Sequence, residues 1–336
     1  MVLDGQDPQA IARAAAQLAA GHLVGLPTET VYGLAADADN PQAVGAIFTA
    51  KGRPSDHPLI VHLAPATGAD HRPAALSHYA AELPDFAGRL IDAFWPGPLT
   101  LILPRRPEHA ATAAGGQASI GLRCPSHPVA QAVLAACLAR GVFGVAAPSA
   151  NQFGRVSPTT AAHVAGEFDF DLLVLDGGPC DVGIESTIVD CSRGAPVLLR
   201  PGAVTAAQIE AACGQPALPP EAMRTDTPRA SGTLESHYAP RARLRLMDAV
   251  ALQAALDLLG ADAAAIAVYA RAPLRARSQA VLHRRMPDDP AATAHQLFAA
   301  LRGFDDAGVK LIWVETPPAD AAWDGVRDRL QRAAAG

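Results

Sequence analysis

The sequence lacks several features that would define a function class directly. Its N-terminus has no basic segment followed by an apolar run, so we expect no signal peptide. No window of about 18 uncharged apolar residues occurs, so we expect no membrane association. A basic excess is also missing: 27 Lys and Arg residues stand against 33 Asp and Glu residues. Because nucleic-acid-binding proteins usually need such an excess, we expect a cytoplasmic protein with at most weak RNA contact.

Metal and phosphate motifs are missing as well. The five cysteines form no CxxC pair, which predicts reduced, buried thiols and no disulfide framework. The 11 histidines are scattered, so the sequence predicts no metal site. It also lacks GxxxxGK[ST], the protein-kinase motif set, GxSxG and HExxH, which means that any ATP is not held by a P-loop.

What is present is a long alternation of strands and helices. A length of 336 residues suggests two domains. The first two-thirds predicts helices at 8–20, 41–50, 127–139 and 159–166, and strands at 22–26, 58–63, 99–103, 120–122, 143–147, 172–175, 186–190 and 197–199. Consecutive late strands without a helix between them indicate a mixed sheet. We therefore predict an α/β domain over residues 1–213.

A proline-rich, polar segment interrupts this pattern over residues 214–243. Segments of this length and composition are typically linkers or functional loops, and we expect a linker that acts as an active-site lid. Beyond it, residues 244–336 again alternate strands and helices. This pattern predicts a smaller, Rossmann-like open α/β domain, although it contains no GxGxxG.

The most informative stretch begins with PTETVYGL and continues to Lys51-Gly52-Arg53-Pro54. Gly52 can adopt a positive φ and end the helix before it. Lys51 and Arg53 could then converge on one polyanion, because lysine supplies a point charge and arginine a fork that matches phosphate oxygens. The alternative is two solvated surface cations.

A second stretch, GVAAPSANQFGRVSPT, places hydroxyl and amide groups after a buried strand. Ser149, Asn151 and Ser157 could orient a nucleotide or its phosphates. The alternative is a turn that uses these residues for backbone reasons.

Two arginines, Arg123 and Arg200, each end an apolar strand. An arginine in such a place needs an anion, which could be a ligand or an internal carboxylate. His62 stands in another apolar strand, where a lone histidine is often a satisfied core residue.

Together these segments resemble the threonylcarbamoyl-AMP synthase family in its long two-domain form. PTETVYGL, KGR, PLIVHL, WPGPLT, SAN, GRVSPT, GIESTIVD, LLRPG and SHYAP occur in the family's order over about residues 8–245. The resemblance implies a twisted mixed-sheet catalytic domain of the YrdC type. It implies an enzyme, a nucleotidyltransferase that makes threonylcarbamoyl-adenylate from L-threonine, bicarbonate and ATP for tRNA modification. It also implies Mg²⁺ with the ATP and further proteins that transfer the group to tRNA.

The resemblance also implies the roles of particular residues. The threonine pocket would be lined by Thr30, His62, Arg123, Ala147 and Ser186. ATP would be surrounded by Lys51, Arg53, His57, Ser119, Ser149, Asn151, Ser157, Arg200 and Tyr238. Lys51 and Arg53 would be catalytic, because they would stabilise the departing pyrophosphate. The sequence departs from the family at His57, where asparagine is common.

Two other functions compete with this one. A carbamoyl transferase that shares the domain would also carry an acylphosphatase-like segment and cysteine-rich zinc motifs, and the sequence contains neither. An RNA-binding or ribosome-assembly module is the other alternative, which the negative net charge disfavours.

Overall fold

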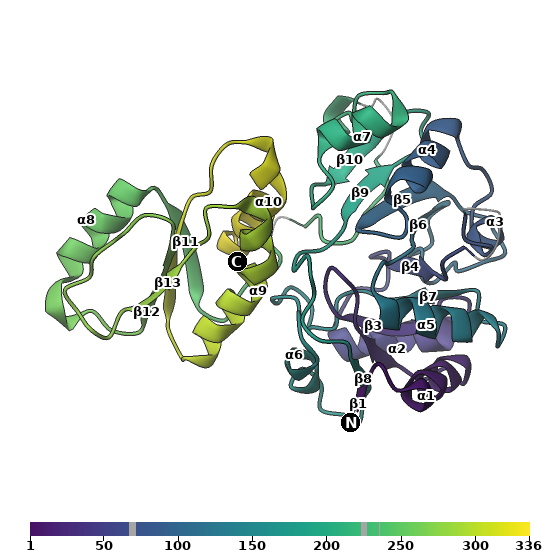
Figure 1. Cartoon of the computed structure of the whole chain (residues 1–336), viewed down its shortest axis with the longest axis horizontal. Coiled ribbons are helices and arrows are strands. Elements are labelled where there is room, and N and C mark those ends of the chain that lie inside the picture. The colour runs from purple at the N-terminus through teal and green to yellow at the C-terminus, as the bar shows by residue number, and fades with distance from the viewer. Residues whose placement is uncertain (67–71, 223–226, 235) are drawn as a thin grey trace. The chain divides into compact units, whose positions relative to one another are not determined.

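A computed structural model describes residues 1–66, 72–222, 227–234 and 236–336. The chain forms two compact units, the first from residues 1–153 with 157–233 and the second from 154–156 with 234–336 (Figure 1). The segment predicted as a linker is therefore divided: 214–233 belongs to the first unit and 234–243 to the second. Residues 223–226 and 235 of that segment lie outside the described residues.

The first unit is built on a ten-stranded mixed sheet with the strand order β1-β8-β2-β3-β7-β4-β6-β5-β9-β10. Pairing is parallel in β1–β8 and β4–β6 and antiparallel in β2–β3 and β5–β6. This confirms the mixed sheet that the sequence predicts. The strands, in chain order, are β1 (Val2–Asp4), β2 (Val24–Leu26), β3 (Gly33–Asp37), β4 (Ile60–Leu63), β5 (Leu99–Pro104), β6 (Ser119–Arg123), β7 (Gly144–Ala146), β8 (Leu173–Asp176), β9 (Thr187–Asp190) and β10 (Val197–Arg200).

Helices cover both faces of this sheet. Leu18 of α1 and Val133 of α5 pack in one core cluster, and Ile47 of α2, Leu90 of α4 and Ile209 of α7 pack in another. Figure 1 shows α4 and α7 together near β9 and β10, and α1 near α5. The helices are α1 (Pro8–Ala19), α2 (Pro41–Lys51), α3 (Leu76–Tyr79), α4 (Asp85–Phe94), α5 (Pro128–Leu138), α6 (Ala161–Ala165) and α7 (Ala206–Cys213), with a 3₁₀ turn η1 (Pro220–Ala222).

Local sequence explains where the helix that carries the KGR turn begins and ends. The side chain of Asn40 caps α2 by accepting from the amides of Gln42 and Ala43, and Pro41 occupies its first turn. Gly52 ends the helix in the left-handed conformation with φ 61°. The expected role of Gly52 is confirmed, and it places Lys51 and Arg53 on either side of a sharp turn.

The second unit is a small open α/β domain, as expected. Its four strands are all parallel, in the order β11-β14-β12-β13. They are β11 (Arg243–Met247), β12 (Ile266–Ala270), β13 (Leu282–Arg285) and β14 (Leu311–Glu315), and the helical elements are α8 (Ala249–Leu259), η2 (Gly260–Asp262), α9 (Pro290–Asp306), η3 (Ala321–Trp323) and α10 (Asp324–Ala334). Within the described part of the chain, no helix combines the length and apolarity that crossing a bilayer requires.

Candidate functional site

Both cationic side chains of the KGR turn are buried, which excludes the alternative of two solvated surface cations. Lys51 is 2% exposed and Arg53 is 7% exposed. The Lys51 ammonium donates to the carbonyl oxygen of Ser149 at 2.6 Å and also to that of Asn151. The structure therefore joins the two most informative stretches of the sequence, which lie about 100 residues apart, at a single ammonium group.

The charge on this turn is only partly neutralised by the protein. The pKa of Lys51 lies well below its ordinary value, because burial disfavours the ammonium and Arg53 adds positive charge beside it. Glu167 and Glu185 act in the opposite direction. Among the described residues, however, no carboxylate forms an ion pair with Lys51; its hydrogen-bond partners are the two carbonyl groups.

Arg53 is held by contacts on three sides. It donates to the carbonyl oxygen of Pro58 at 2.9 Å and to the Ser231 hydroxyl at 3.3 Å. Its guanidinium carbon lies 5.6 Å from the centre of the Phe153 ring, and the His57 ring meets the same phenyl ring edge-on. Burial and then the charge of Arg53 lower the pKa of His57, which favours a neutral ring beside the cation.

Arg123 has an internal carboxylate partner, the alternative that the sequence leaves open. Its guanidinium forms a buried ion pair with Glu29 at 2.6 Å and donates to the Thr30 hydroxyl at 2.8 Å and the Gly97 carbonyl at 3.1 Å. Glu29 was not among the predicted site residues, although it lies inside PTETVYGL. Its position between Thr28 and Thr30 in that stretch was the available signal.

The pair keeps Glu29 ionised in spite of its burial. Desolvation raises the pKa of Glu29, but the charge and hydrogen bond of Arg123 and two backbone hydrogen bonds more than offset it, so the net pKa is lowered. This side of the site is thus close to electrically neutral.

His62 lies next to Arg123 on the neighbouring strand, because β4 and β6 pair in parallel with these two residues in register. It is 3% exposed, and burial followed by the charge of Arg123 lowers its pKa to about 3. Its Nδ1 atom has no hydrogen-bond partner among the described residues. The structure thus places a buried, neutral imidazole beside Arg123, and its contact with threonine stays a prediction.

Arg200 and Ser186 form a second buried group beside β5. The Ser186 hydroxyl lies 2.7 Å from the Thr100 hydroxyl and accepts from Arg200 at 3.2 Å. Arg200 also donates to the backbone carbonyl of Ser186 at 3.0 Å and to that of Ser231 at 2.8 Å. The structure thus brings together a predicted threonine-pocket residue and a predicted ATP residue.

Ser157 pairs with a carboxylate that the sequence reading missed. Its hydroxyl donates to Glu185, and both side chains are buried. Glu185 directly precedes Ser186 in the GIESTIVD stretch, so the motif contained the signal. Ala147 is held where β7 ends, since its amide donates to the carbonyl of Ile60.

Residues 229–231 of the predicted lid lie over Ser119. Together with Ile60 and Gln117 they line one small cavity. Gln117 exchanges two hydrogen bonds with the backbone of Arg229, at 2.8 and 3.2 Å, and Arg229 forms an ion pair with Asp56 at 2.7 Å. Through Ser231, this segment contacts two predicted ATP residues, Arg53 and Arg200, and it shares a cavity with a third, Ser119.

Tyr238 is the one predicted site residue that belongs to the second unit. It is 1% exposed and has a φ of 60°. Its ring packs 5.6 Å from that of Phe298, and the guanidinium of Arg329 lies 5.3 Å from its centre. These contacts give it a packing role within the second unit, and its contact with ATP stays a prediction.

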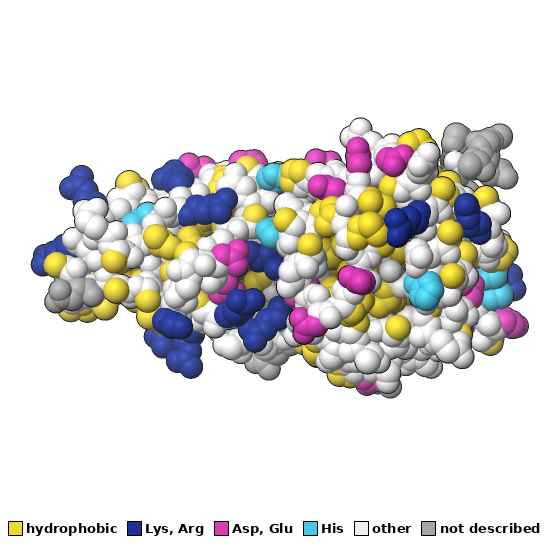
Figure 2. All heavy atoms as spheres, turned by 90° about the horizontal axis from the view of Figure 1, so that it is seen from below, with side chains coloured by type: hydrophobic (Ala, Val, Ile, Leu, Met, Phe, Trp, Pro, Cys, Tyr) yellow, Lys and Arg dark blue, Asp and Glu magenta, His cyan; other side chains and the backbone are white. Residues whose placement is uncertain are grey.

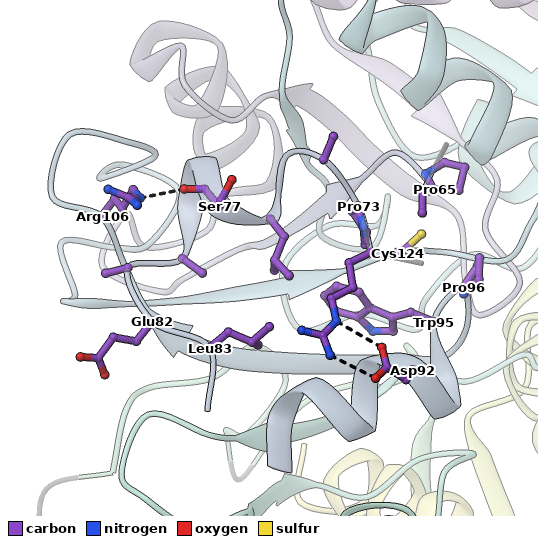
Figure 3. Close-up of a pocket in the computed structure, with 16 residues that line it drawn as sticks. Pro65, Pro73, Ser77, Glu82, Leu83, Asp92, Trp95, Pro96, Arg106 and Cys124 are labelled. Carbon is purple, nitrogen blue, oxygen red and sulfur yellow. Dashed lines mark hydrogen bonds and ion pairs between the residues drawn. The ribbon is translucent and has the colours of Figure 1, made fainter. Parts of the chain in front are cut away.

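A large cavity of the first unit, about 1200 Å³, lies elsewhere (Figure 3). Trp95, Pro96 and Cys124 line one side of it, and the exposed ion pair of Arg72 with Asp92 crosses its rim. None of the predicted site residues lines it. For that reason we place the chemistry at the buried cations and not in this cavity.

Both units match families of known proteins. Residues 16–202 match a family model described as Telomere recombination (Sua5, YciO and YrdC), and residues 204–335 match one described as Threonylcarbamoyl-AMP synthase, C-terminal domain. The chain is 37% identical to the threonylcarbamoyl-AMP synthase of Bacillus subtilis over 99% of this chain and 95% of that protein. It is 35% identical to the enzyme of the same name from Pyrococcus abyssi over 93% and 90%.

A solved structure also matches this chain over nearly its whole length. P. abyssi Sua5 complexed with L-threonine superposes with a TM-score of 0.87 and 33% sequence identity, and the match covers 99% of this chain and 97% of that chain. The likeness therefore includes the YrdC-like first unit and the α/β second unit.

The buried His62 generates a prediction for the pH dependence of stability. Its pKa is about 3 in the folded protein and 6.5 in the unfolded chain, so the unfolded chain binds more protons between these values. Acidification from about pH 6.5 towards 3 should therefore lower the free energy of unfolding of the first unit by up to about 1.4 kcal/mol per pH unit on account of this residue.

His62→Gln should flatten the pH profile in this window, whatever it does to absolute stability. The measurement is the urea midpoint at a series of pH values, read from β4 peptides by pulsed hydrogen–deuterium exchange and mass spectrometry. His22→Gln, at an exposed position, is the control and should leave the slope unchanged. An unaltered slope in His62→Gln would contradict the assignment of a neutral, buried imidazole.

Proposed function

The chain belongs to the threonylcarbamoyl-AMP synthase family, and we propose that it makes threonylcarbamoyl-adenylate and pyrophosphate from L-threonine, bicarbonate and ATP. The observation that carries this proposal is the buried Lys51 ammonium, held by carbonyl groups without an ion-pair partner among the described residues. A buried charge of this kind is costly unless an anion approaches it. The polyphosphate of ATP supplies that anion.

The reaction needs two substrates to meet at the α-phosphate of ATP. The threonine amine reacts with bicarbonate to give a carbamate, with loss of water. A carbamate oxygen then attacks the α-phosphorus, and the bond to the bridging oxygen of the β-phosphate breaks. Negative charge builds up on the departing pyrophosphate, where Lys51 and Arg53 stabilise it.

The threonine side of the site requires little net charge, because an amino acid carries one charge of each sign. Thr30, His62, Arg123, Ser186 and the backbone of Ala147 are the residues that we assign to it. Arg123 is the cation that we assign to the threonine carboxylate, and Glu29 already holds it in place. Neutral His62, in register with Arg123, would contribute a polar ring to the threonine pocket without adding charge.

The ATP side comprises the remaining assigned residues. These are Lys51, Arg53, His57, Ser119, Ser149, Asn151, Ser157, Arg200 and Tyr238. Mg²⁺ would accompany the triphosphate. The carboxylate of Glu185, which accepts from Ser157, fits the oxygen-donor preference of this ion. The ion would supply additional neutralisation of phosphate charge.

The product would pass to further proteins that transfer the threonylcarbamoyl group to adenosine beside the anticodon of tRNA. Residues 263–287 of the second unit carry five arginines and no Asp or Glu, and Arg275, Arg277 and Arg284 are exposed. Figure 2 shows Lys and Arg side chains spread over this end of the chain. Such a stretch suits weak contact with RNA phosphates.

We also propose that residues 227–233 act as a lid over the ATP side of the site. The ion pair of Arg229 with Asp56 is exposed, and exposed pairs contribute little to holding the segment closed. Ala230 packs against the small core cluster on β5, β9 and β10, so opening would also expose that contact. When closed, it adds the Ser231 hydroxyl beside Arg53 and excludes water from Ser119. Exclusion of water would protect the labile adenylate from hydrolysis.

The substrate requirement tests the proposed function. Pyrophosphate release from ATP should need L-threonine and bicarbonate together, and mass spectrometry of the mixture should find threonylcarbamoyl-adenylate. L-serine should be a poorer substrate, since it lacks a methyl group whose burial is worth about 1 kcal/mol. Equal pyrophosphate release with threonine omitted would overturn the assignment.

Removing the positive charges tests the electrostatic role of the KGR turn. Lys51→Met and Arg53→Met should each lower turnover by about 100-fold or more, because each removes a contact to the departing pyrophosphate. Both residues are buried, so thermal unfolding must be recorded to establish that the variants are folded. Arg140→Met, at an exposed site on the surface, is the matched control. Near-normal turnover in both folded variants would refute a catalytic role.

Limited proteolysis tests the lid. Trypsin should cut after the exposed Arg229 in the free protein, and ATP with L-threonine should slow that cut several-fold by favouring the closed segment. Cleavage after the exposed Arg277 in the second unit serves as the internal control and should be unaffected. If ligands leave both cuts equally fast while product still forms, the segment is a passive connection and the proposed function stands without it.

A further inference from the structure

Three segments far apart in the sequence bring an aspartate and two histidines together, away from the site described above. Asp39 follows β3, His78 lies on α3 and His109 follows β5. His78 Nε2 lies 2.8 Å from one oxygen of Asp39, and His109 Nδ1 lies 3.7 Å from the other. One ligand atom from each residue falls within 4.8 Å of the other two.

An ordinary hydrogen-bonded pair explains only part of this arrangement. The contact of His78 with Asp39 is a hydrogen bond, but the distance from His109 to the same carboxylate is too long for one. The centroids of the two imidazole rings lie 3.6 Å apart, and a nitrogen of each ring lies near the same carboxylate. Two imidazoles and a carboxylate around a common point are the donor set of an open transition-metal site.

The surroundings orient these three side chains. The Tyr79 hydroxyl donates to one oxygen of Asp39 at 2.9 Å, and the Ala110 amide donates to the other at 3.0 Å. Phe143 stacks on the His78 ring with centroids 4.1 Å apart. Partners that fix a carboxylate and an imidazole in this way are what metal ligands usually have around them.

The backbone next to His109 supports the same conclusion. Ala110 has a φ of 48°, a left-handed conformation that is unfavourable for a residue with a Cβ atom. In this conformation the Ala110 amide donates to Asp39, and the ring of the preceding residue, His109, lies beside His78. Such conformations cost free energy and concentrate at functional sites.

We propose that Asp39, His78 and His109 bind one zinc ion. Nitrogen ligands favour zinc over Mg²⁺ or Ca²⁺, which prefer oxygen ligands alone. The ion would take the place of the proton shared by His78 and Asp39, and water would occupy its fourth position, since the three side chains are 18–31% exposed. Bound zinc would link the turn after β3, α3 and the loop after β5, and so stabilise the first unit.

The experiment uses the full chain after treatment with a chelator and dialysis. Competition with a chromogenic zinc chelator should give one site per chain. His109→Gln, Asp39→Asn and His78→Gln should each weaken binding by more than about 100-fold, because each removes one of three ligands. Zinc at about 100 times its dissociation constant should raise the melting temperature of the first unit by roughly 5–10 °C, and the variants should lose this shift.

Two controls separate this site from adventitious binding. His22→Gln, at an exposed position, should bind zinc as the unaltered chain does. Co²⁺ in place of zinc should give the visible absorption of a low-symmetry nitrogen–oxygen site without the intense band of thiolate ligands, since all five cysteines are buried elsewhere. His109→Gln keeps the buried contacts of His78, so its folding is the least at risk. Unchanged zinc affinity in folded His109→Gln, or a thiolate band with Co²⁺, would overturn the proposal.

Discussion

The site is organised around the burial of a single ammonium group. Lys51 ends α2, and its Nζ atom lies against the carbonyl oxygens of Ser149 and Asn151 after β7. Carbonyl dipoles soften the cost of burying the charge but do not cancel it. The turn at Gly52 then sets Arg53 beside the same charge, which lowers the pKa of Lys51 further. The fold thus places two positively charged side chains where the polyphosphate of ATP would bind. The contacts of Lys51 with the carbonyl groups hold the end of α2 close to the end of β7.

Charge is divided unequally between the two halves of the site. Around Arg123, Glu29 provides a buried counter-charge and His62 is held neutral, so the threonine half has little net charge. Around Lys51 and Arg53, carbonyl and hydroxyl groups predominate as partners. An amino acid with one charge of each sign suits the first half, and a multiply charged anion suits the second. Glu29, placed by the turn between β2 and β3, pairs directly with the cation of the first half, whereas Glu167 and Glu185 only partly offset the lowered pKa of Lys51.

Much of the architecture could be predicted from the hydrophobic pattern alone. Buried strands such as β5 and β7 are mostly apolar, and helices such as α2 carry proline and cap signals. The pattern did not predict β1, β3, α3, α4, α7 or β13. β3 consists mostly of small residues without alternation, and β13 is an exposed edge strand with two arginines. α4 begins after Pro84 without a side-chain cap, whereas α7 has a capping box of Thr205 and Gln208 that was a usable signal.

The sequence by itself determined the family, the mixed α/β class and the short motifs, because these depend on local order along the chain. It could not decide whether Arg123 meets a ligand or an internal acid, since only the pairing of β4 with β6 and the turn before β3 bring Glu29, Thr30 and His62 around it. Nor could it distinguish buried from solvated cations in the KGR turn, because burial there is imposed by residues about 100 positions away. For the same reason the scattered histidines predicted no metal site. Contacts between distant segments are set by sheet order and register, and these are properties of the tertiary structure.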